Sequence, residues 1–168
     1  MSTESRIIDE ADRKILGLLQ ADARASNVAI ARQVGLAPSA TLERIRKLEK
    51  SGIIQGYTAR LDPKALGVGL VAFVFVRSRE RVGHTGTARL LARLPEILEV
   101  HHIAGEDCFL VKVRAADTEA LGRLLREGFG RAPTIVSTRT TIVLETVKET
   151  PALPLPAGGA HRGGGRRG

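Results

Sequence analysis

The sequence predicts an α+β protein that combines an N-terminal helix-turn-helix domain with a C-terminal ferredoxin-like βαββαβ sandwich. Two observations carry this prediction. Three helical patterns follow one another between residues 10 and 51, and strand-like and helical patterns alternate from residue 70 to residue 147. In a chain of 168 residues each part is near the lower size limit for a self-sufficient core, so we expect association with a further copy.

Capping residues mark the helices of the N-terminal part. Asp9 precedes a first helix expected over residues 10–21, and Ser26 precedes a second helix that ends before Gly35. Pro38 begins a third helix, because proline at the first helical position loses no hydrogen bond. The second helix carries, as its apolar residues, Val28, Ala31 and Val34.

The third helix, expected to run to about Ser51, has the two faces that a DNA-reading helix needs. Its inner side consists of Thr41, Leu42, Ile45 and Leu48. The candidate DNA-binding surface on the outward side consists of Ser39, Ala40, Glu43, Arg44, Arg46, Lys47 and Lys50. We expect the first turns to lie nearest the bases, and the cationic side chains to meet phosphates or guanine edges. A solvated helix face is the alternative, but the two supporting helices favour DNA binding.

The domain boundary is expected where turn chemistry follows a strand-like run. Residues 53–61 have the strand-like pattern, and residues 62–69 contain the proline and glycines of a hinge. The expected parts are a winged helix-turn-helix DNA-binding domain at 1–61, the hinge at 62–69, a dimerisation and effector-binding domain at 70–150, and a disordered Pro/Gly/Arg tail at 151–168.

The C-terminal domain shows the element order of a split sandwich. The expected strands are residues 70–78, 97–104, 108–115 and 135–147, and the expected helices are residues 84–94 and the segment after Asp117. The first strand is apolar on both faces, whereas the helices of a two-layer sandwich cover one face of the sheet. The other face predicts a sheet-to-sheet homodimer, which also suits paired half-sites on DNA. A central position in a better-covered sheet is the alternative.

The charge balance favours a polyanionic partner. The formal net charge is +8 and the sequence pI is about 10.5. The net charge is +3 for residues 1–60, +2 for 61–150 and +3 for 151–168, so no part is a simple basic tract. Aromatic residues make up 3% of the chain, too few for the stacking platforms that grip single strands, and we expect duplex DNA as the partner. The arginines of the tail offer phosphate attraction, and a solvated tail without a role is the alternative.

Other classes of protein and site are disfavoured. No apolar run is long enough to cross a membrane and no signal-peptide pattern is present, so we expect no membrane contact and a cytoplasmic location. Cys108 has no second cysteine for a disulfide or metal site, and we expect a small buried apolar role. His101 and His102 point to opposite faces of a strand and cannot converge on one ion, while His84 and His161 are isolated. We expect no metal and no cofactor.

Short runs of residues along most of the chain form a specific set. They are Asp9–Leu16, Leu19–Arg24, Val34–Leu36, Leu42–Glu49, Gly52–Tyr57, Gly105–Asp107 and Thr138–Thr140. This set resembles the Lrp/AsnC (feast/famine) family of regulators. The resemblance implies a winged helix-turn-helix, a ferredoxin-like regulatory domain, homodimers that gather into octamers as tetramers of dimers, and control of amino-acid metabolism by amino-acid-like effectors.

A candidate effector site lies at the hairpin expected between residues 104 and 108. Gly105, Glu106 and Asp107 combine a glycine turn, whose N–H groups suit a carboxylate, with acceptors for an ammonium. By position the resemblance adds Thr138 and Thr140, lining the same site between subunits. A plain hairpin with a solvated acidic tip is the alternative.

Two residues depart from the family pattern. Ala37 stands where members often have a capping serine, and the loss of such a cap costs about 1 kcal/mol of helix stability. Cys108 stands where many members have an acidic residue, so an acceptor of the effector site is missing.

Three functions follow from these patterns. The first is a sequence-specific transcription regulator that controls amino-acid metabolism or transport in response to an amino-acid-like effector. The second is an architectural DNA-binding protein without effector control. The third is an enzyme similar to the haem-pathway decarboxylases, which resemble this family in both domains. No convergent acid–base set is present to carry out such chemistry, and we expect no enzymatic activity.

Overall fold

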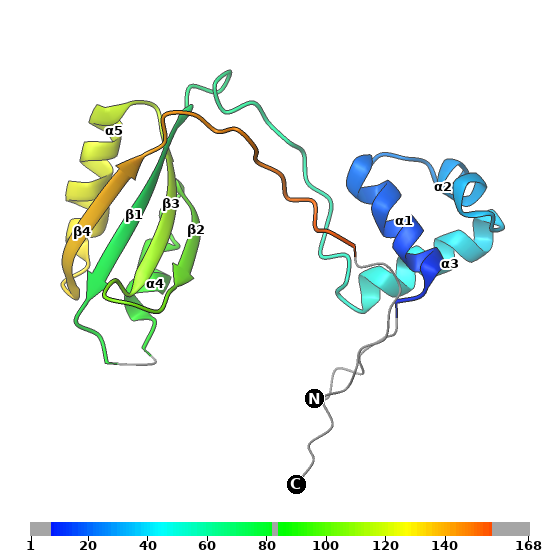
Figure 1. Cartoon of the computed structure of the whole chain (residues 1–168), viewed down its shortest axis with the longest axis horizontal. Coiled ribbons are helices and arrows are strands. Elements are labelled where there is room, and N and C mark those ends of the chain that lie inside the picture. The colour runs from blue at the N-terminus through cyan, green and yellow to red at the C-terminus, as the bar shows by residue number, and fades with distance from the viewer. Residues whose placement is uncertain (1–7, 82–83, 156–168) are drawn as a thin grey trace, which may run out of the picture. The chain divides into compact units, whose positions relative to one another are not determined.

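The computed structural model describes residues 8–81 and 84–155 and divides into two compact units (Figure 1). Unit 1 consists of residues 1–59 and 150–168, and unit 2 consists of residues 60–149. The hinge expected at residues 62–69 thus belongs to unit 2, where residues 63–67 form a turn. Of the tail expected to be disordered, residues 151–155 belong to unit 1, and residues 156–168 lie outside the described part of the chain.

Unit 1 is built on three helices whose bounds follow their capping residues. They are α1 (Glu10–Ala21), α2 (Asn27–Val34) and α3 (Pro38–Lys50). The Asp9 carboxylate accepts a backbone hydrogen bond of 2.8 Å from the first turn of α1, and the Ser26 hydroxyl accepts one of 3.2 Å from α2. Gly35 ends α2 with a φ of 76°, a left-handed conformation that glycine adopts without steric cost. The three predicted helices are confirmed.

The core of unit 1 lies where the three helices meet. Its buried residues are Ile15, Leu16, Ile30, Ile45 and Leu48. Leu42, which was assigned to the inner side of the third helix, is instead 37% exposed. Val28, one of the expected apolar residues of the second helix, is 59% exposed. Val28 lies about 200° around the helix axis from the buried Ile30, and Leu42 lies about 120° from the buried Leu48.

The segment after α3 is held against that helix but forms no strand, so the strand predicted at residues 53–61 is wrong for this single chain. Ile53 and Ile54 donate backbone hydrogen bonds of 3.0 and 3.1 Å to the carbonyl of Leu48. The Tyr57 hydroxyl donates to the Glu49 carboxylate at 2.9 Å. A strand requires a neighbour whose backbone groups pair with its own, and the described residues supply none here.

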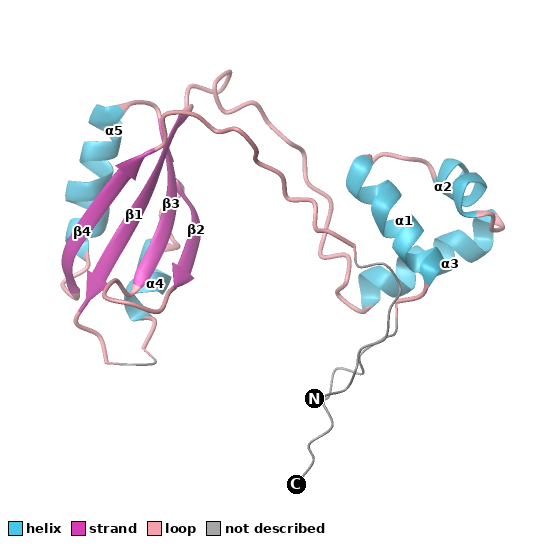
Figure 2. Cartoon of the chain, in the orientation of Figure 1, coloured by secondary structure: helices cyan, strands magenta, loops and turns pink. Residues whose placement is uncertain are grey.

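Unit 2 is a four-stranded antiparallel sheet with helices on one face (Figure 2). The strands are β1 (Leu70–Ser78), β2 (Ile97–His102), β3 (Phe109–Ala115) and β4 (Ile135–Ile142). The helices are α4 (Gly86–Leu91) and α5 (Thr118–Arg123), which continues as a π-helical turn (Leu124–Gly128) and a 3₁₀ turn (Phe129–Arg131). The sheet order β2-β3-β1-β4 confirms the predicted ferredoxin-like sandwich.

Two elements of unit 2 are shorter than predicted. α4 covers residues 86–91 of the expected 84–94, and β4 ends at Ile142 although its strand-like pattern continues to residue 147. β4 pairs with β1, which begins at Leu70, and the last backbone bond of this ladder joins the N–H of Val143 to the carbonyl of Val71 at 2.9 Å. Beyond it the partner strand has ended, so the ladder stops.

The two faces of the sheet differ in what covers them. The helix-covered core contains Val74, Val76, Val111, Val113 and Phe109 together with the helical Leu91, Leu121 and Phe129. The side chains that alternate with these core residues form the face that we call the open face, made of Val71, Phe73, Phe75, Glu99, His101, Leu110, Lys112, Arg114 and Arg139. No helix of the described chain covers the open face (Figure 1).

Candidate nucleic-acid interface and ligand-binding site

Contacts at the turn fix the start of α3 relative to α2. The Asn27 amide, at the beginning of α2, donates to the carbonyl of Pro38 at 2.7 Å. Ala37 occupies the N-cap of α3 and makes no side-chain capping bond, in keeping with the departure seen in the sequence. The Thr41 hydroxyl turns inward and donates to the Ala37 carbonyl at 3.2 Å. Side-chain hydrogen bonds to the carbonyls of Ala37 and Pro38 therefore hold the turn between α2 and α3, in place of a capping side chain.

The outward side of α3 carries most of the candidate DNA-binding residues at the surface. Ser39, Glu43, Arg46, Lys47 and Lys50 are exposed, whereas Ala40 is half-buried. Glu43 forms an ion pair with Lys47, and the hydrogen bond from Lys47 holds the pKa of Glu43 below its ordinary value. Within the described part of the chain, Arg46 and Lys50 of this surface form no ion pair, while Lys47 must exchange its carboxylate partner for a phosphate.

Arg44 is placed differently from the other candidates. Its guanidinium donates to the carboxylates of Asp9 at 2.7 Å and Asp12 at 2.9 Å, both on the N-terminal side of α1. The Asp12 side chain is 2% exposed, so this ion pair lies inside the junction of α1 and α3. Backbone bonding at the N-cap and the Arg44 guanidinium together lower the pKa of Asp9. These contacts give Arg44 a structural role, and we leave it out of the proposed DNA contacts.

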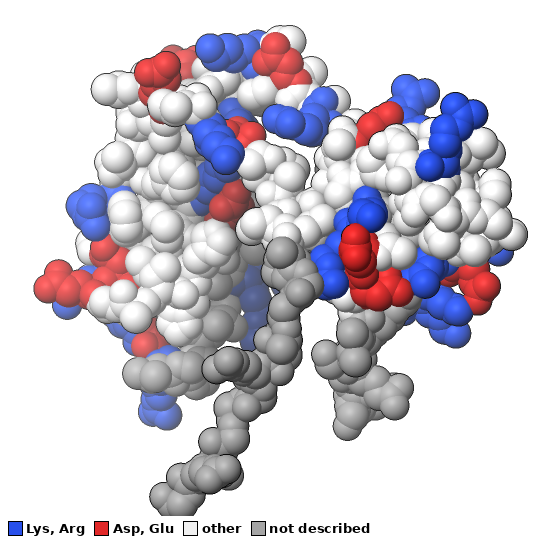
Figure 3. Space-filling model, turned by 45° about the vertical axis from the view of Figure 1, so that its right-hand side comes forward, with Lys and Arg blue, Asp and Glu red and all other residues white. Residues whose placement is uncertain are grey.

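Acidic side chains lie among the basic ones in Figure 3, and no broad basic tract covers the face shown there. In unit 1 the acidic residues Glu10 and Glu43 pair with neighbouring lysines of their own helices. Attraction to DNA therefore depends on particular side chains rather than on a uniform field.

The hairpin between β2 and β3 forms one wall of a cavity of about 240 Å³. Gly105 has a φ of 134°, a backbone conformation that residues with a side chain rarely adopt. The cavity is lined by Ser78, Glu80, His102, Gly105, Asp107 and Cys108, among others. Cys108 is half-buried and accepts a hydrogen bond of 3.4 Å on its sulfur from the Ser78 N–H, so it serves as a packing residue of the hairpin.

An arginine of β4 closes the hairpin from the open face. Arg139 donates to the Asp107 carboxylate at 3.0 Å, and its guanidinium carbon lies 4.0 Å from the centre of the Phe75 ring. Thr138 and Thr140 pair with Val76 and Val74 and therefore point to the opposite face of β4 from Arg139.

The described chain brings two of the five candidate effector residues to the cavity. Gly105 and Asp107 line it, whereas Glu106, Thr138 and Thr140 do not. Arg139 and Glu80 were missed by the sequence reasoning. One oxygen of Glu80 accepts from the Thr87 N–H at 2.8 Å, and the other, Oε2, is buried without a hydrogen-bond partner. No local signal in the sequence marks Arg139, because 32 residues separate it from Asp107.

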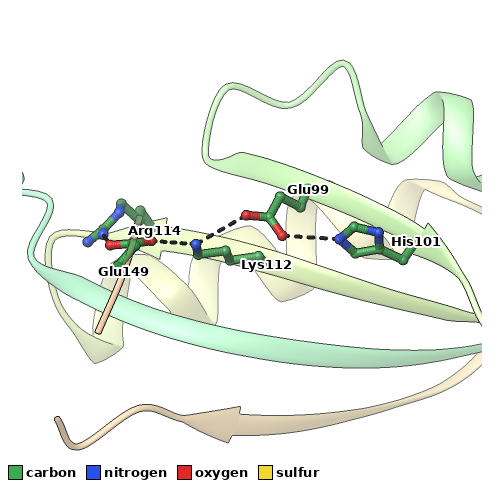
Figure 4. Close-up of polar contacts among 5 residues, drawn as sticks. All are labelled: Glu99, His101, Lys112, Arg114 and Glu149. Atoms are coloured by element: carbon green, nitrogen blue, oxygen red, sulfur yellow. Dashed lines mark hydrogen bonds and ion pairs between the residues drawn. The ribbon is translucent and has the colours of Figure 1, made fainter. Parts of the chain in front are cut away.

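A row of ion pairs crosses the open face (Figure 4). Lys112 bonds to Glu149 and, at 3.1 Å, to Glu99, while Arg114 donates to Glu149 at 2.8 Å and His101 contacts Glu99 at 3.1 Å. The hydrogen bond from Lys112 lowers the pKa of Glu149, and that from His101 lowers the pKa of Glu99. Each charge of the row has an opposite partner, which reduces the cost of removing this face from water.

Potential metal ligands are dispersed over the described residues, 8–81 and 84–155. No cluster of three or more His, Cys, Asp or Glu side chains is arranged to hold a metal ion in that part. His102 packs on the Phe109 ring with a centroid separation of 5.3 Å, while His101 joins the ion-pair row. The helices in the same residues are all too short or too polar to cross a membrane.

Two domain families match the chain. Residues 8–55 match the winged helix-turn-helix DNA-binding family, and residues 71–153 match the Lrp/AsnC ligand binding domain. These matched ranges correspond to the helices of unit 1 and the sheet of unit 2.

Named relatives are similar over most of the chain. An HTH-type transcriptional regulator of Pyrococcus horikoshii is 41% identical over 148 residues, which cover 88% of this chain and 97% of the relative. The leucine-responsive regulatory protein of Escherichia coli is 41% identical over 147 residues, which cover 85% of this chain and 88% of the relative.

Solved structures show the same architecture. A transcriptional regulator from Neisseria meningitidis, in complex with L-methionine, has a TM-score of 0.83 and 30% identity over 88% of this chain and 97% of its own. The feast or famine regulatory protein of Mycobacterium tuberculosis, also complexed with L-methionine, has a TM-score of 0.80 and 33% identity over 88% and 99%. These matched proteins are named as regulators, two of them as transcriptional regulators. The chain belongs to the Lrp/AsnC family of transcriptional regulators.

Proposed function

We propose that this regulator binds specific duplex sites as a homodimer and controls genes of amino-acid metabolism or transport in response to an amino-acid-like effector. The observation that carries the proposal is α3, whose inner residues Thr41 and Leu48 are fully buried while Ser39, Arg46 and Lys50 are exposed. A helix that is packed on one side and polar or cationic on the other can enter a major groove without unfolding its own domain.

The proposed contacts follow the position of each residue along α3. Ser39, Ala40 and Glu43 lie in the first turns and read base edges, since the N-terminal part of a recognition helix faces them. Arg46, Lys47 and Lys50 lie further along and bind phosphates or guanine edges. Action on genomic DNA places the protein in the cytoplasm.

The homodimer is proposed to form through the open face. Phe73, Phe75 and Leu110 offer apolar area there, and the neighbouring ion-pair row is already neutralised within the chain. The family resemblance extends this to a tetramer of dimers. Sedimentation equilibrium tests the assembly, and a monomer at micromolar concentration would refute it.

The effector is proposed to bind at the hairpin cavity. Its volume of about 240 Å³ suits a ligand smaller than a typical drug molecule. The N–H groups of the Gly105 turn can donate to a carboxylate, while Asp107 and the unpartnered oxygen of Glu80 can accept from an ammonium. Thr138 and Thr140 complete the site from a neighbouring subunit. L-methionine in two similar structures supports an amino acid as the ligand class.

DNA binding is tested by fluorescence anisotropy on the full chain with its own upstream region. The slope of log K against log salt is negative, and each phosphate contact contributes about 0.9 to its magnitude. Replacing Arg46, Lys47 and Lys50 by glutamine should therefore reduce the magnitude of this slope by about 2 to 3. The matched control replaces three exposed arginines of unit 2, Arg89, Arg93 and Arg126. No preference over a scrambled duplex, or equal losses for both triple variants, would refute this proposal.

An effector-independent architectural role is the second candidate, favoured by the Asp107–Arg139 ion pair, which already occupies an acceptor of the cavity. Thermal shift against the twenty amino acids separates the two functions. A ligand raises the stability by RT ln(1 + [L]/Kd), and Asp107→Asn should abolish the shift. If no amino acid raises the melting temperature while DNA binding persists, the architectural role stands.

A further inference from the structure

The first turn of α3 and the rest of that helix are held by different neighbours. From the middle of α3 onward, Ile45 and Leu48 are buried in the core of unit 1, and the Arg44 guanidinium forms ion pairs with α1. The first turn is joined to α2 by a hydrogen bond of 2.7 Å, which the side-chain amide of Asn27 donates to the carbonyl of Pro38. Within the described chain, no other side chain of α2 makes a hydrogen bond to α3.

The first turn of α3 has few polar attachments of its own. Ala37 at the N-cap makes no side-chain hydrogen bond, and Pro38 has no N–H to donate. The Thr41 hydroxyl bonds to the Ala37 carbonyl at the start of the same helix, so it does not connect α3 to α2. The polar connection that places this turn relative to α2 is therefore the Asn27 amide.

The Asn27 amide is poorly suited to stabilise the fold. Its oxygen, Oδ1, is buried and has no hydrogen-bond partner among the described residues. A buried acceptor without a partner loses its hydration, and this loss opposes the gain from the bond that the amide nitrogen donates. The amide thus fixes the position of the Pro38 carbonyl at little net gain in stability.

We propose that Asn27 is a positioning residue for base recognition, because it sets where the first turn of α3 meets the base edges. The proposal rests on the DNA-binding function proposed above and deepens it. Ser39 and Ala40 follow Pro38 directly, so a displacement of the Pro38 carbonyl moves both. Base contacts specify sequence and depend on the distances and angles of hydrogen bonds, whereas attraction to phosphates does not depend on sequence. Asn27 therefore acts on discrimination between sequences more than on the overall affinity for DNA.

The variant Asn27→Ala removes the donated bond and the buried oxygen together. The preference for a duplex of the protein's own upstream region over a scrambled duplex should fall about tenfold, which is within the range that one mismatched base pair costs. The affinity for the scrambled duplex should stay unchanged, because Arg46, Lys47 and Lys50 lie beyond the first turn. The melting temperature should also stay unchanged. Gln33→Ala, at an exposed amide of the same helix, is the matched control and should alter none of the three quantities.

A second variant, Asn27→Asp, keeps the shape of the side chain. At about pH 8 its carboxyl group is ionised, so it accepts hydrogen bonds and donates none to the Pro38 carbonyl. The negative charge lies at the first residue of α2, where it favours the helix, so the melting temperature should not fall. The same charge repels both duplexes, and the ratio of the two affinities is therefore the quantity compared. This ratio should fall at least as far as in Asn27→Ala.

Fluorescence anisotropy with both duplexes and circular dichroism on heating decide between the outcomes. An unchanged affinity ratio in Asn27→Ala would overturn the positioning role. A ratio that falls only together with the melting temperature in both variants would also overturn it, because Asn27 would then support the fold of unit 1.

The wild type separates the positioning role from the proposed function. If it prefers its upstream duplex while the Asn27 variants discriminate equally well, the positioning role alone is refuted. If the wild type shows no preference, the proposed sequence-specific function is refuted and the positioning role with it.

Discussion

The ion pairs of Arg44 with Asp9 and Asp12 indicate that Arg44 stabilises unit 1, whereas other cations of α3 are proposed to contact DNA. The Arg44→Met variant keeps a side chain of similar length and removes the charge that joins α3 to Asp9 and Asp12. Because Asp12 is 2% exposed on its side chain, its carboxylate would remain buried without this cation. We expect unit 1 to lose stability, while the outward surface of α3 stays intact in the molecules that remain folded.

The magnitude follows from the two ion pairs taken separately. The Asp9 side chain is 49% exposed, so its pair contributes about 0–1 kcal/mol. The Asp12 carboxylate accepts a charged hydrogen bond from Arg44 inside this junction, and the loss of one such bond costs about 2–3 kcal/mol. The sum of about 2–4 kcal/mol should lower the melting temperature of unit 1 by about 8–32 °C, since a small domain shifts by about 4–8 °C per kcal/mol.

Circular dichroism on heating and anisotropy at a temperature where the variant is folded measure the two effects. The control is Arg46→Met, at the next exposed cation of α3, which should keep the melting temperature and lose DNA affinity. Adding Asp12→Asn to Arg44→Met should restore part of the stability, as expected for a coupled pair. If Arg44→Met melts at the wild-type temperature and loses DNA affinity like Arg46→Met, Arg44 faces the duplex and the structural assignment is refuted.

Three further predictions concern stability. Ala37→Ser should provide the missing cap of α3 and raise the free energy of unfolding by about 1 kcal/mol, whereas unchanged urea unfolding would contradict it. Gly35→Ala should lower that free energy by about 1–2 kcal/mol, because φ is 76° there; equal melting of both proteins would show that α2 can end differently. The folded pKa of Glu149 is lowered from 4.5, so its contribution is present above pH 4.5 and lost as the pH falls through the folded value. Between pH 7 and pH 3 the Glu149→Gln variant should therefore lose less free energy of unfolding than the wild type, by up to about 1 kcal/mol. If both proteins show the same dependence of stability on pH, the Glu149–Lys112 ion pair does not contribute to it.

The helices of unit 1 could be predicted closely because their signals are local. Asp9, Ser26 and Pro38 each act within a few residues of their own position, and the structure begins a helix after or at each of them. The sheet order could be predicted for a related reason, since the alternation of elements leaves few topologies. Periodicity was less reliable at the border of a face, as Val28 and Leu42 show.

Long-range partners could not be predicted from one sequence. Arg44 was assigned to the DNA surface because its position on the helix allows it, and its pairing depends on how α3 crosses α1. Asp12 carried a signal, since it lies on the same stripe of α1 as the buried Ile15 and Leu16 and a buried carboxylate needs a cation. Arg139 carried no such signal, because nothing near it in the sequence indicates that the hairpin tip reaches β4.

Two segments that were predicted to be strands do not form strands in the single chain. Their sequences support assembly with a second copy of the chain rather than an error in reading the pattern. Residues 53–61 and 143–147 both have strand-like composition, and both lack a neighbouring strand among the described residues. Leu144 is 99% exposed and Val147 is 90% exposed, next to an open face that no helix of the described chain covers. Strand propensity reflects packing on a pleated surface as well as the backbone, so these segments keep their pattern only if another surface meets them. In a two-fold dimer, a second copy of the chain would supply that surface at the same position on both subunits. The need for such a surface favours the proposed homodimer over a monomeric DNA-binding protein.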